Sequence, residues 1–201
     1  MARMAARNPS ADELVDASDS ALLIVDVQEG FLAKIEEDRR AAVVGRIVFL
    51  AEAAAWLEIP IVATVETPED WGGLHTEIGR ALPDLTPVRK EVFALGHDPN
   101  VWPVVRALDR RTLVLCGLET DVCVAQSALS LVGHGYEVVG VGDAMASPGA
   151  PHEYGLERMK AAGVRLLSTK QLHYEWMRTV PNARRFRAER PDVAIPPGMI
   201  P

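Results

Sequence analysis

The 201-residue sequence predicts one α/β domain of three layers, with a six-stranded, mainly parallel sheet between two layers of helices. Short apolar runs alternate with longer segments of helical periodicity along most of the chain. Several of these runs are apolar at every position, which is typical of parallel strands covered on both faces. The hydrophobic fraction of 48% suffices for one complete core, and the length leaves little room for a second domain.

The strands are predicted from their composition and from the turn residues that bound them. The first predicted strand, 21–27, reads Ala-Leu-Leu-Ile-Val-Asp-Val and carries Asp26 near its carboxyl end. The second enters through Pro60, which suits the first residues of a strand. The six predicted strands cover residues 21–27, 59–65, 88–93, 112–117, 137–142 and 164–167.

The helices are predicted from apolar spacing and from capping signals. Asn100 is a possible cap for a helix in which Pro103 falls within the first turn. Gly133 and Gly135 end another helix. The predicted helices cover residues 41–57, 100–108, 121–132, 153–162 and 169–177. Because the crossover connections of such a fold leave ligands at the carboxyl ends of the strands, Asp26, Glu66 and Asp143 are expected at that edge.

The chain divides into three parts on composition. Residues 1–19 are expected to form an N-terminal extension, residues 20–180 the domain, and residues 181–201 a tail rich in proline and arginine. The extension mixes acidic residues among alanines, unlike a signal peptide. The arginines between 184 and 190 alternate with acidic residues, which predicts a solvated tail that is ordered only against a partner subunit.

Composition also narrows the class of partner. The net charge is −7, from 21 basic and 28 acidic residues, and this balance argues against binding nucleic acid. The apolar runs are too short to cross a membrane. Two cysteines do not form a disulfide framework, so we expect a reducing, cytoplasmic location.

The segment Gly117–Val124 is the most informative part of the sequence. A buried strand stops at Gly117, and a helix is expected to begin near Cys123. A thiol at a helix N-terminus experiences the helix dipole, which favours the thiolate. The unpaired amides of that turn, those of Glu119 and Cys123, could hold an oxyanion. The alternative is a small, buried and inert cysteine, as expected for Cys116.

Two charged residues change the balance of these alternatives. Asp26 ends an apolar strand, where a carboxylate is costly to bury unless something pairs with it or uses it. It could also serve only to cap a neighbouring loop. Lys90 lies between Arg89 and Glu91, where plain solvent exposure is the alternative interpretation.

Taken together, these residues resemble the isochorismatase-like cysteine hydrolases from about Ser20 to about Arg178. The resemblance depends on Asp26-Val27-Gln28 followed by Phe31, on Lys90 followed by Phe93, and on the Gly-x-x-Thr-x-x-Cys-Val segment that ends at Val124. It implies an Asp26–Lys90–Cys123 catalytic triad, a cis peptide bond at Leu118–Glu119, and a homo-oligomer. The apolar helix around residues 124–132 and the tail are the expected contact surfaces between subunits.

The resemblance also directs attention to the substrate pocket. The pocket candidates are Gln28, Phe31, Glu66, Thr67, Trp71 and Phe93. Nicotinamidases of the family bind a metal through an Asp-x-His pair after the second strand, and Asp70 and His75 lack that spacing. We therefore predict no metal and no cofactor, and the branch is one whose substrates are mostly unassigned.

The predicted function is hydrolysis of a small molecule, at an amide or ureide C–N bond or at an ether bond, with Cys123 as nucleophile. One alternative is a non-catalytic or redox-sensing protein on the same fold, in which Cys123 is a thiol switch. A nucleotide-binding domain is less favoured, because only Gly30 follows the first strand where a glycine-rich turn would be needed.

Overall fold

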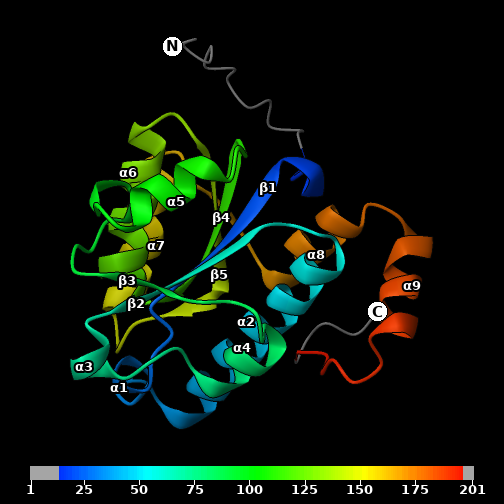
Figure 1. Ribbon diagram of the computed structural model, residues 1–201, viewed down its shortest axis with the longest axis horizontal. Helices are drawn as coiled ribbons and strands as arrows, with labels where there is room; N and C mark the ends of the chain where they lie inside the picture. Colours follow the sequence, from blue (N-terminus) through cyan, green and yellow to red (C-terminus); the bar gives the residue numbers. More distant parts are fainter. Residues whose placement is uncertain (1–13, 197–201) are drawn as a thin grey trace.

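The computed structural model describes residues 14–196 and contains the predicted α/β architecture (Figure 1). The strands are β1 (Ser20–Val25), β2 (Ile61–Glu66), β3 (Val88–Lys90), β4 (Thr112–Leu118), β5 (Glu137–Ala146) and β6 (Arg165–Leu167). They form one sheet in the order β3-β2-β1-β4-β5-β6, and every neighbouring pair is parallel. The prediction of the fold class is confirmed.

Helices cover both faces of this sheet. They are α1 (Glu29–Leu32), α2 (Glu37–Trp56), α3 (Pro68–Trp71), α4 (Thr76–Ala81), α5 (Val101–Ala107), α6 (Ala125–Gly133), α7 (Pro151–Ala161), α8 (Thr169–Met177) and α9 (Val180–Glu189). Short 3-10 turns η1 (Ala17–Asp19) and η2 (Leu95–His97) and a π-helical turn η3 (Thr120–Val124) complete the described elements. Helices α5, α6 and α7 lie on one face, and α2 and α8 on the other (Figure 1). None of the helices within residues 14–196 is long and apolar enough to cross a membrane.

The strand β1 shows why the apolar runs predict a sheet with two covered faces. All six of its residues are buried. Leu22 and Ile24 belong to the core on the α2 side, whereas Leu23 and Val25 belong to the core on the α6 side. Successive side chains of a strand point to opposite faces, so one continuous apolar run supplies both cores.

The predicted end of the fifth strand and the predicted place of Asp143 are both wrong. The strand β5 continues past residue 142 to Ala146 after a shift in its register with β4. Asp143 therefore lies within β5, and its carboxylate accepts hydrogen bonds from the Thr169 backbone N–H at 2.7 Å and the Thr169 hydroxyl at 2.8 Å. It is used to hold the start of α8 and does not join Asp26 and Glu66.

The segment that begins at residue 180 is also not the solvated tail predicted from its arginines. It forms α9, which packs against α2 of the same chain through Phe186. The ring of this fully buried residue lies edge-on to Phe49 at 5.8 Å and to Trp56 at 5.6 Å. Charged residues of α9 contribute as well, since Glu189 accepts a hydrogen bond from the Trp56 indole at 2.8 Å and Arg190 pairs with Glu52 at 3.6 Å. The rest of the predicted tail, from residue 197, lies outside the described residues, as do residues 1–13 of the predicted extension.

The helix proposed as a contact surface between subunits is largely unavailable for that task. Val124, Ala128 and Leu131 are fully buried in the core of their own chain. An apolar stripe on a helix indicates burial but does not say whether the covering surface belongs to the same chain.

The packing of α9 yields a first prediction. Phe186→Ala should lower the free energy of unfolding by about 3 kcal/mol, since it removes a fully buried aromatic ring. Denaturant unfolding measures this change, and Ala188→Ser on the exposed side of the same helix should change stability by less than about 0.5 kcal/mol. Equal stability of the two variants would show that α9 is not docked on α2 in solution.

Candidate active site

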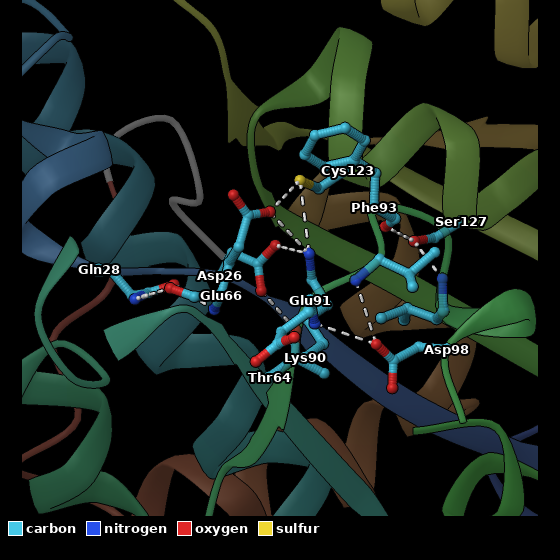
Figure 2. A network of polar contacts seen from close by, with 12 residues as sticks. Asp26, Gln28, Thr64, Glu66, Lys90, Glu91, Phe93, Asp98, Cys123 and Ser127 are labelled. Carbon is cyan, nitrogen blue, oxygen red and sulfur yellow. Dashed lines mark hydrogen bonds and ion pairs between the residues drawn. The ribbon is translucent and has the colours of Figure 1, made fainter. Parts of the chain in front are cut away.

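Two carboxylates, one ammonium and one thiol meet at the carboxyl edge of the sheet (Figure 2). Asp26 directly follows β1, Glu66 ends β2 and Lys90 ends β3, while Cys123 lies in η3, which follows β4. Glu66 and Lys90 are paired residues of neighbouring strands. The parallel sheet therefore brings together residues that are up to 97 positions apart in the sequence.

The Lys90 ammonium lies at the centre of this group. Its Nζ is 2.7 Å from Asp26 Oδ2, 2.9 Å from Glu66 Oε2 and 3.6 Å from Cys123 Sγ. The Cys123 thiol donates to Glu66 Oε2 at 3.2 Å, and the Thr64 hydroxyl donates to Asp26 Oδ1 at 2.8 Å. Ligand atoms of Asp26, Glu66 and Cys123 all lie within 4.8 Å of one another. The three side chains predicted to converge therefore do so, with Glu66 as a fourth.

These groups are almost completely removed from solvent. Asp26 and Lys90 are 0% exposed and Cys123 is 3% exposed, whereas the Glu66 side chain retains 13%. Burying a charge without a partner is strongly unfavourable, so the ammonium and its two carboxylates depend on one another. Glu66 is the most accessible member of the group.

Burial and charge shift the ionisation of all three predicted residues. Burial raises the pKa of Asp26, although Lys90 and Thr64 oppose the shift. Burial alone would lower the pKa of Lys90, but the neighbouring Asp26 and Cys123 raise it above its usual value. Burial, followed by the charge of Asp26, raises the pKa of Cys123 against the opposing effect of Lys90. The helix dipole and Lys90 were expected to favour the thiolate and Asp26 to oppose it; the raised pKa shows that burial and the negative charges prevail, so the thiol of Cys123 needs a base.

The cluster also contains residue types that bind metals. Asp26, Glu66 and Cys123 could each offer one ligand atom. However, the Lys90 Nζ lies within 3.6 Å of all three side chains, where it already supplies positive charge. A metal ion at this position would have to displace the ammonium. The arrangement therefore fits the Lys90 ammonium better than a bound metal ion.

The turn that carries Cys123 is built by close backbone contacts. Gly117 has φ of 119°, and a Cβ there would collide with the carbonyl oxygen of Val25 on the neighbouring strand. The Leu118–Glu119 peptide bond is cis. Cys123 lies inside the π-helical turn, so it does not open the α-helix as predicted; α6 begins at Ala125.

The hydrogen bonds of this turn bear on the proposed oxyanion site. The Glu119 carbonyl accepts hydrogen bonds from the amides of Val122 at 3.2 Å and Val124 at 3.1 Å. The amide of Cys123, between these two residues in the sequence, does not bond to this carbonyl. A developing negative charge beside Sγ would lie near this amide. The role of the Glu119 and Cys123 amides stays a prediction.

Among the pocket candidates, Gln28 has a different task from the predicted one. Its side-chain amide donates to the carbonyls of Glu66 at 2.9 Å and Gly72 at 2.5 Å, and its oxygen accepts from the Glu66 amide at 2.7 Å. Gln28 is fully buried, so these bonds hold the end of β2 and leave no group for a substrate. It is a positioning residue for Glu66.

Phe31 and Trp71 form an aromatic pair with a cation above it. Their rings stack at 4.7 Å, and the Lys34 Nζ lies 4.7 Å and 4.3 Å from the two ring centroids. Lys34 also donates to Glu119 Oε1 at 3.1 Å, which joins this pair to the Cys123 turn. Phe31 is nearly buried and Trp71 half-buried, so Trp71 is the more accessible of the two.

The other two pocket candidates differ in accessibility. Thr67 is half-buried and has φ of 31°, a left-handed conformation that places the chain sharply after Glu66. Phe93 is 48% exposed, and the neighbouring Val92 is exposed as well. Neither side chain has a contact that assigns it to a substrate.

Two residues important for the site were missed from the sequence. Asp98 is buried and accepts backbone hydrogen bonds from Glu91 and Val92, directly after Lys90, and from Asn100 and Val101 at the start of α5. Burial opposes its ionisation, but these bonds lower the pKa of Asp98. It therefore takes the capping role predicted for Asn100. A capping signal for Asp98 was present, since it precedes the helix by three residues.

Thr64 is the second missed residue. It lies two positions before Glu66 on β2, and residues two apart in a strand share a face. This period-2 pattern could have placed Thr64 beside Asp26, because β2 and β1 are neighbours.

Comparison with known proteins agrees with this geometry. Residues 20–171 match the isochorismatase domain. Isochorismatase domain-containing protein 2 of Xenopus laevis is 31% identical over 153 residues, which cover 75% of this chain and 72% of that protein. The chain therefore belongs to the isochorismatase family of hydrolases.

Two solved structures share the fold. YcaC from Pseudomonas aeruginosa, solved with hexane-2,5-diol and covalent acrylamide, has a TM-score of 0.81 at 26% identity and covers 92% of this chain and 93% of its own. Escherichia coli YcaC, described as an octameric hydrolase of unknown specificity, has a TM-score of 0.80 at 24% identity, with coverages of 93% and 95%. The likeness extends over the whole domain.

The burial of the two cysteines yields a second prediction. Acrylamide should alkylate Cys123 in preference to Cys116, which lies fully buried in β4. Because the pKa of Cys123 is raised, its labelling rate should keep rising with pH beyond about 8.5, where an ordinary thiol levels off. Mass mapping of each cysteine over a pH series measures both effects.

The control for this labelling is a matched lysine. Lys90→Ala removes the charge that favours the thiolate and should slow labelling by about tenfold, whereas Lys170→Ala at an exposed position should not. Labelling of Cys116 first, or equal labelling of both cysteines, would contradict the assignment of Cys123 as the reactive thiol.

Proposed function

We propose that this protein hydrolyses a C–N bond in a small amide or ureide, with Cys123 as the nucleophile and Asp26 and Lys90 completing the triad. The observation that supports the proposal best is the set of groups around the thiol: Glu66 Oε2 lies 3.2 Å from Sγ, Lys90 Nζ lies 3.6 Å from it, and an Asp26 carboxylate oxygen lies within 4.8 Å. Such surroundings allow a thiol to lose its proton as it attacks and to regain it afterwards.

In the first half of the reaction, the Asp26 carboxylate accepts the thiol proton and Sγ attacks the carbonyl carbon of the substrate. Asp26 suits this role because its raised pKa brings a carboxyl group closer to neutral pH, where general acid–base catalysis is efficient. Lys90 remains protonated and stabilises both carboxylates. The amides of Glu119 and Cys123 would bind the oxyanion.

In the second half, the proton held by Asp26 passes to the leaving nitrogen as the C–N bond breaks, which releases ammonia or an amine and leaves a thioester on Cys123. Water then attacks the thioester carbon and gives its proton to Asp26. The C–S bond breaks, the acid product departs and the thiol is restored. All protons are returned, and no oxidant or reductant is required.

The charge of the site favours substrates that are not anions. Two carboxylates surround one ammonium, and Glu66 is the member that retains exposure. An anionic substrate beside Glu66 would experience direct repulsion in a poorly solvated environment. We therefore propose an uncharged or cationic amide, and place the ether-hydrolysing alternative second because ether hydrolysis leaves the thiol without a role.

The thiol-switch alternative is less well supported. Redox-sensing cysteines combine a low pKa with accessibility, whereas Cys123 has a raised pKa and is buried. The buried Asp26–Lys90 pair would also have no evident purpose in a protein that only exposes a thiol.

We also propose that the protein is a cytoplasmic homo-oligomer without a cofactor. Both cysteines are free, in keeping with a reducing compartment, and the related E. coli YcaC is octameric. The exposed Val92 and Phe93, which directly follow Lys90 and Glu91, offer an apolar surface for a subunit contact. They replace the helix 124–132 as the candidate contact.

A screen of small amides and ureides tests the proposal through release of ammonia or amine. Wild-type protein should hydrolyse at least one uncharged member, and Cys123→Ser should lower kcat/KM by about a thousandfold or more. Asp26→Asn should lower it by about 10²–10⁴-fold through loss of the base. Thermal unfolding controls for folding. Full activity of Cys123→Ser, or turnover of enol ethers alone, would contradict the mechanism.

The role of Glu66 makes a separate prediction about specificity. Glu66→Gln keeps the shape of the side chain but removes its charge, so the kcat/KM ratio of an anionic amide, succinamate, to uncharged butyramide should rise by about tenfold. Glu69→Gln, an exposed change on the following helix, is the control and should leave the ratio unchanged. An unchanged ratio in Glu66→Gln would remove the basis for charge selection.

A further inference from the structure

The structure contains a cavity that none of the four residues of the candidate active site lines. It has a volume of about 630 Å³ and is formed by residues of α2, α8 and α9 together with Ile195. In Figure 1 these helices lie on the α2 face of the sheet, with α9 as the outermost element. The volume is within the range of pockets that hold small molecules. None of Asp26, Glu66, Lys90 and Cys123 lines it.

The cavity combines an apolar wall with positive charge. Phe49, Val180 and Ala183 contribute apolar surface, and Arg184 and Arg187 lie beside them. A third arginine, Arg178, also lines the cavity. An apolar surface next to guanidinium groups suits a molecule with a hydrocarbon body and an anionic end.

These three arginines have no carboxylate partners among residues 14–196 within 4.0 Å. Arg187 donates to the Val193 carbonyl at 2.8 Å, and Arg178 donates to the Val15 carbonyl at 3.1 Å, which leaves their other N–H groups available. In contrast, Arg185 on the same helix pairs with Glu189 and stacks over Trp56. Arg178 also faces Asp16 and helps to lower the pKa of that carboxyl group. Arg184 and Arg187 are therefore the two arginines of the cavity that have no acidic neighbour among residues 14–196.

His173 adds a neutral ring to the lining of the cavity. It lines the cavity and is 4% exposed, yet its Nδ1 has no hydrogen-bond partner among the described residues. Its ring is held against Phe49 at 4.9 Å and Phe186 at 5.4 Å. Burial and the nearby Arg187 lower the pKa of His173 to about 4, so the ring is neutral at pH 7. Because this Nδ1 atom is itself buried, the ring offers the cavity a neutral surface and no hydrogen bond from Nδ1.

We propose that this cavity binds a small amphiphilic carboxylate, with its hydrocarbon chain against Phe49 and Ala183 and its anionic group beside Arg184 and Arg187. The site is distinct from the candidate active site, and the proposal does not depend on the hydrolase activity.

Calorimetric titration of the full-length protein with octanoate tests the proposal. Octanoate should bind at least about tenfold more tightly than octan-1-ol, which lacks the charge, and than acetate, which lacks the chain. Binding should persist in Cys123→Ala, since the active site is not involved. Equal binding of octanoate and octan-1-ol, or no octanoate binding up to about 10 mM, would overturn the proposal.

Arginine variants locate the bound anion. Arg184 is exposed and makes no contact on which folding depends, so Arg184→Glu should remain folded and weaken octanoate binding by at least about tenfold through charge reversal. Arg185→Glu makes the same charge change on the same helix outside the cavity and should have a much smaller effect. Equal weakening by the two variants would mean that only the general charge of α9 attracts the anion, and would refute a site in the cavity.

Discussion

The buried Lys90 ammonium is the interaction on which the rest of the site depends. It lies between the carboxylates of Asp26 and Glu66, at 2.7 Å and 2.9 Å, where Asp26 and Lys90 are fully buried and only Glu66 retains some exposure. Removing the ammonium leaves two neighbouring buried carboxylates without a counter-charge, so both depend on Lys90. The Cys123 thiol lies 3.6 Å from this ammonium and shares its electrostatic environment.

Several parts of the fold keep this charge group in place. Gln28 ties β2 to the chain after β1, and Asp98 holds the loop that follows Lys90. The approach of Gly117 to Val25 fixes where β4 turns into the segment that carries Cys123. These contacts are to backbone groups, so they position the reactive side chains without competing with them for hydrogen bonds. These supports come from the strand ends and from the segments that follow them.

The sequence alone determined the fold class and three of the side chains that meet at the candidate site. Apolar runs such as β1 are buried on both faces, and this pattern needs no knowledge of the neighbouring strands. Asp26 was recognisable because a carboxylate at the end of such a run requires a partner. Lys90 and Cys123 followed from the spacing of motifs that resemble a known family. Local composition was sufficient wherever the information lay within one element.

Tertiary structure decided what depends on contacts between distant elements. Whether Cys123 rests as a thiol follows from the burial and charges that Asp26 and Glu66 impose, and neither is visible in the local turn. The same holds for α9, whose arginines predict solvent exposure while one buried Phe186 docks the helix. Charge and polarity describe a segment by itself, whereas burial is a property of the surfaces that meet it, and these come together only when the chain folds.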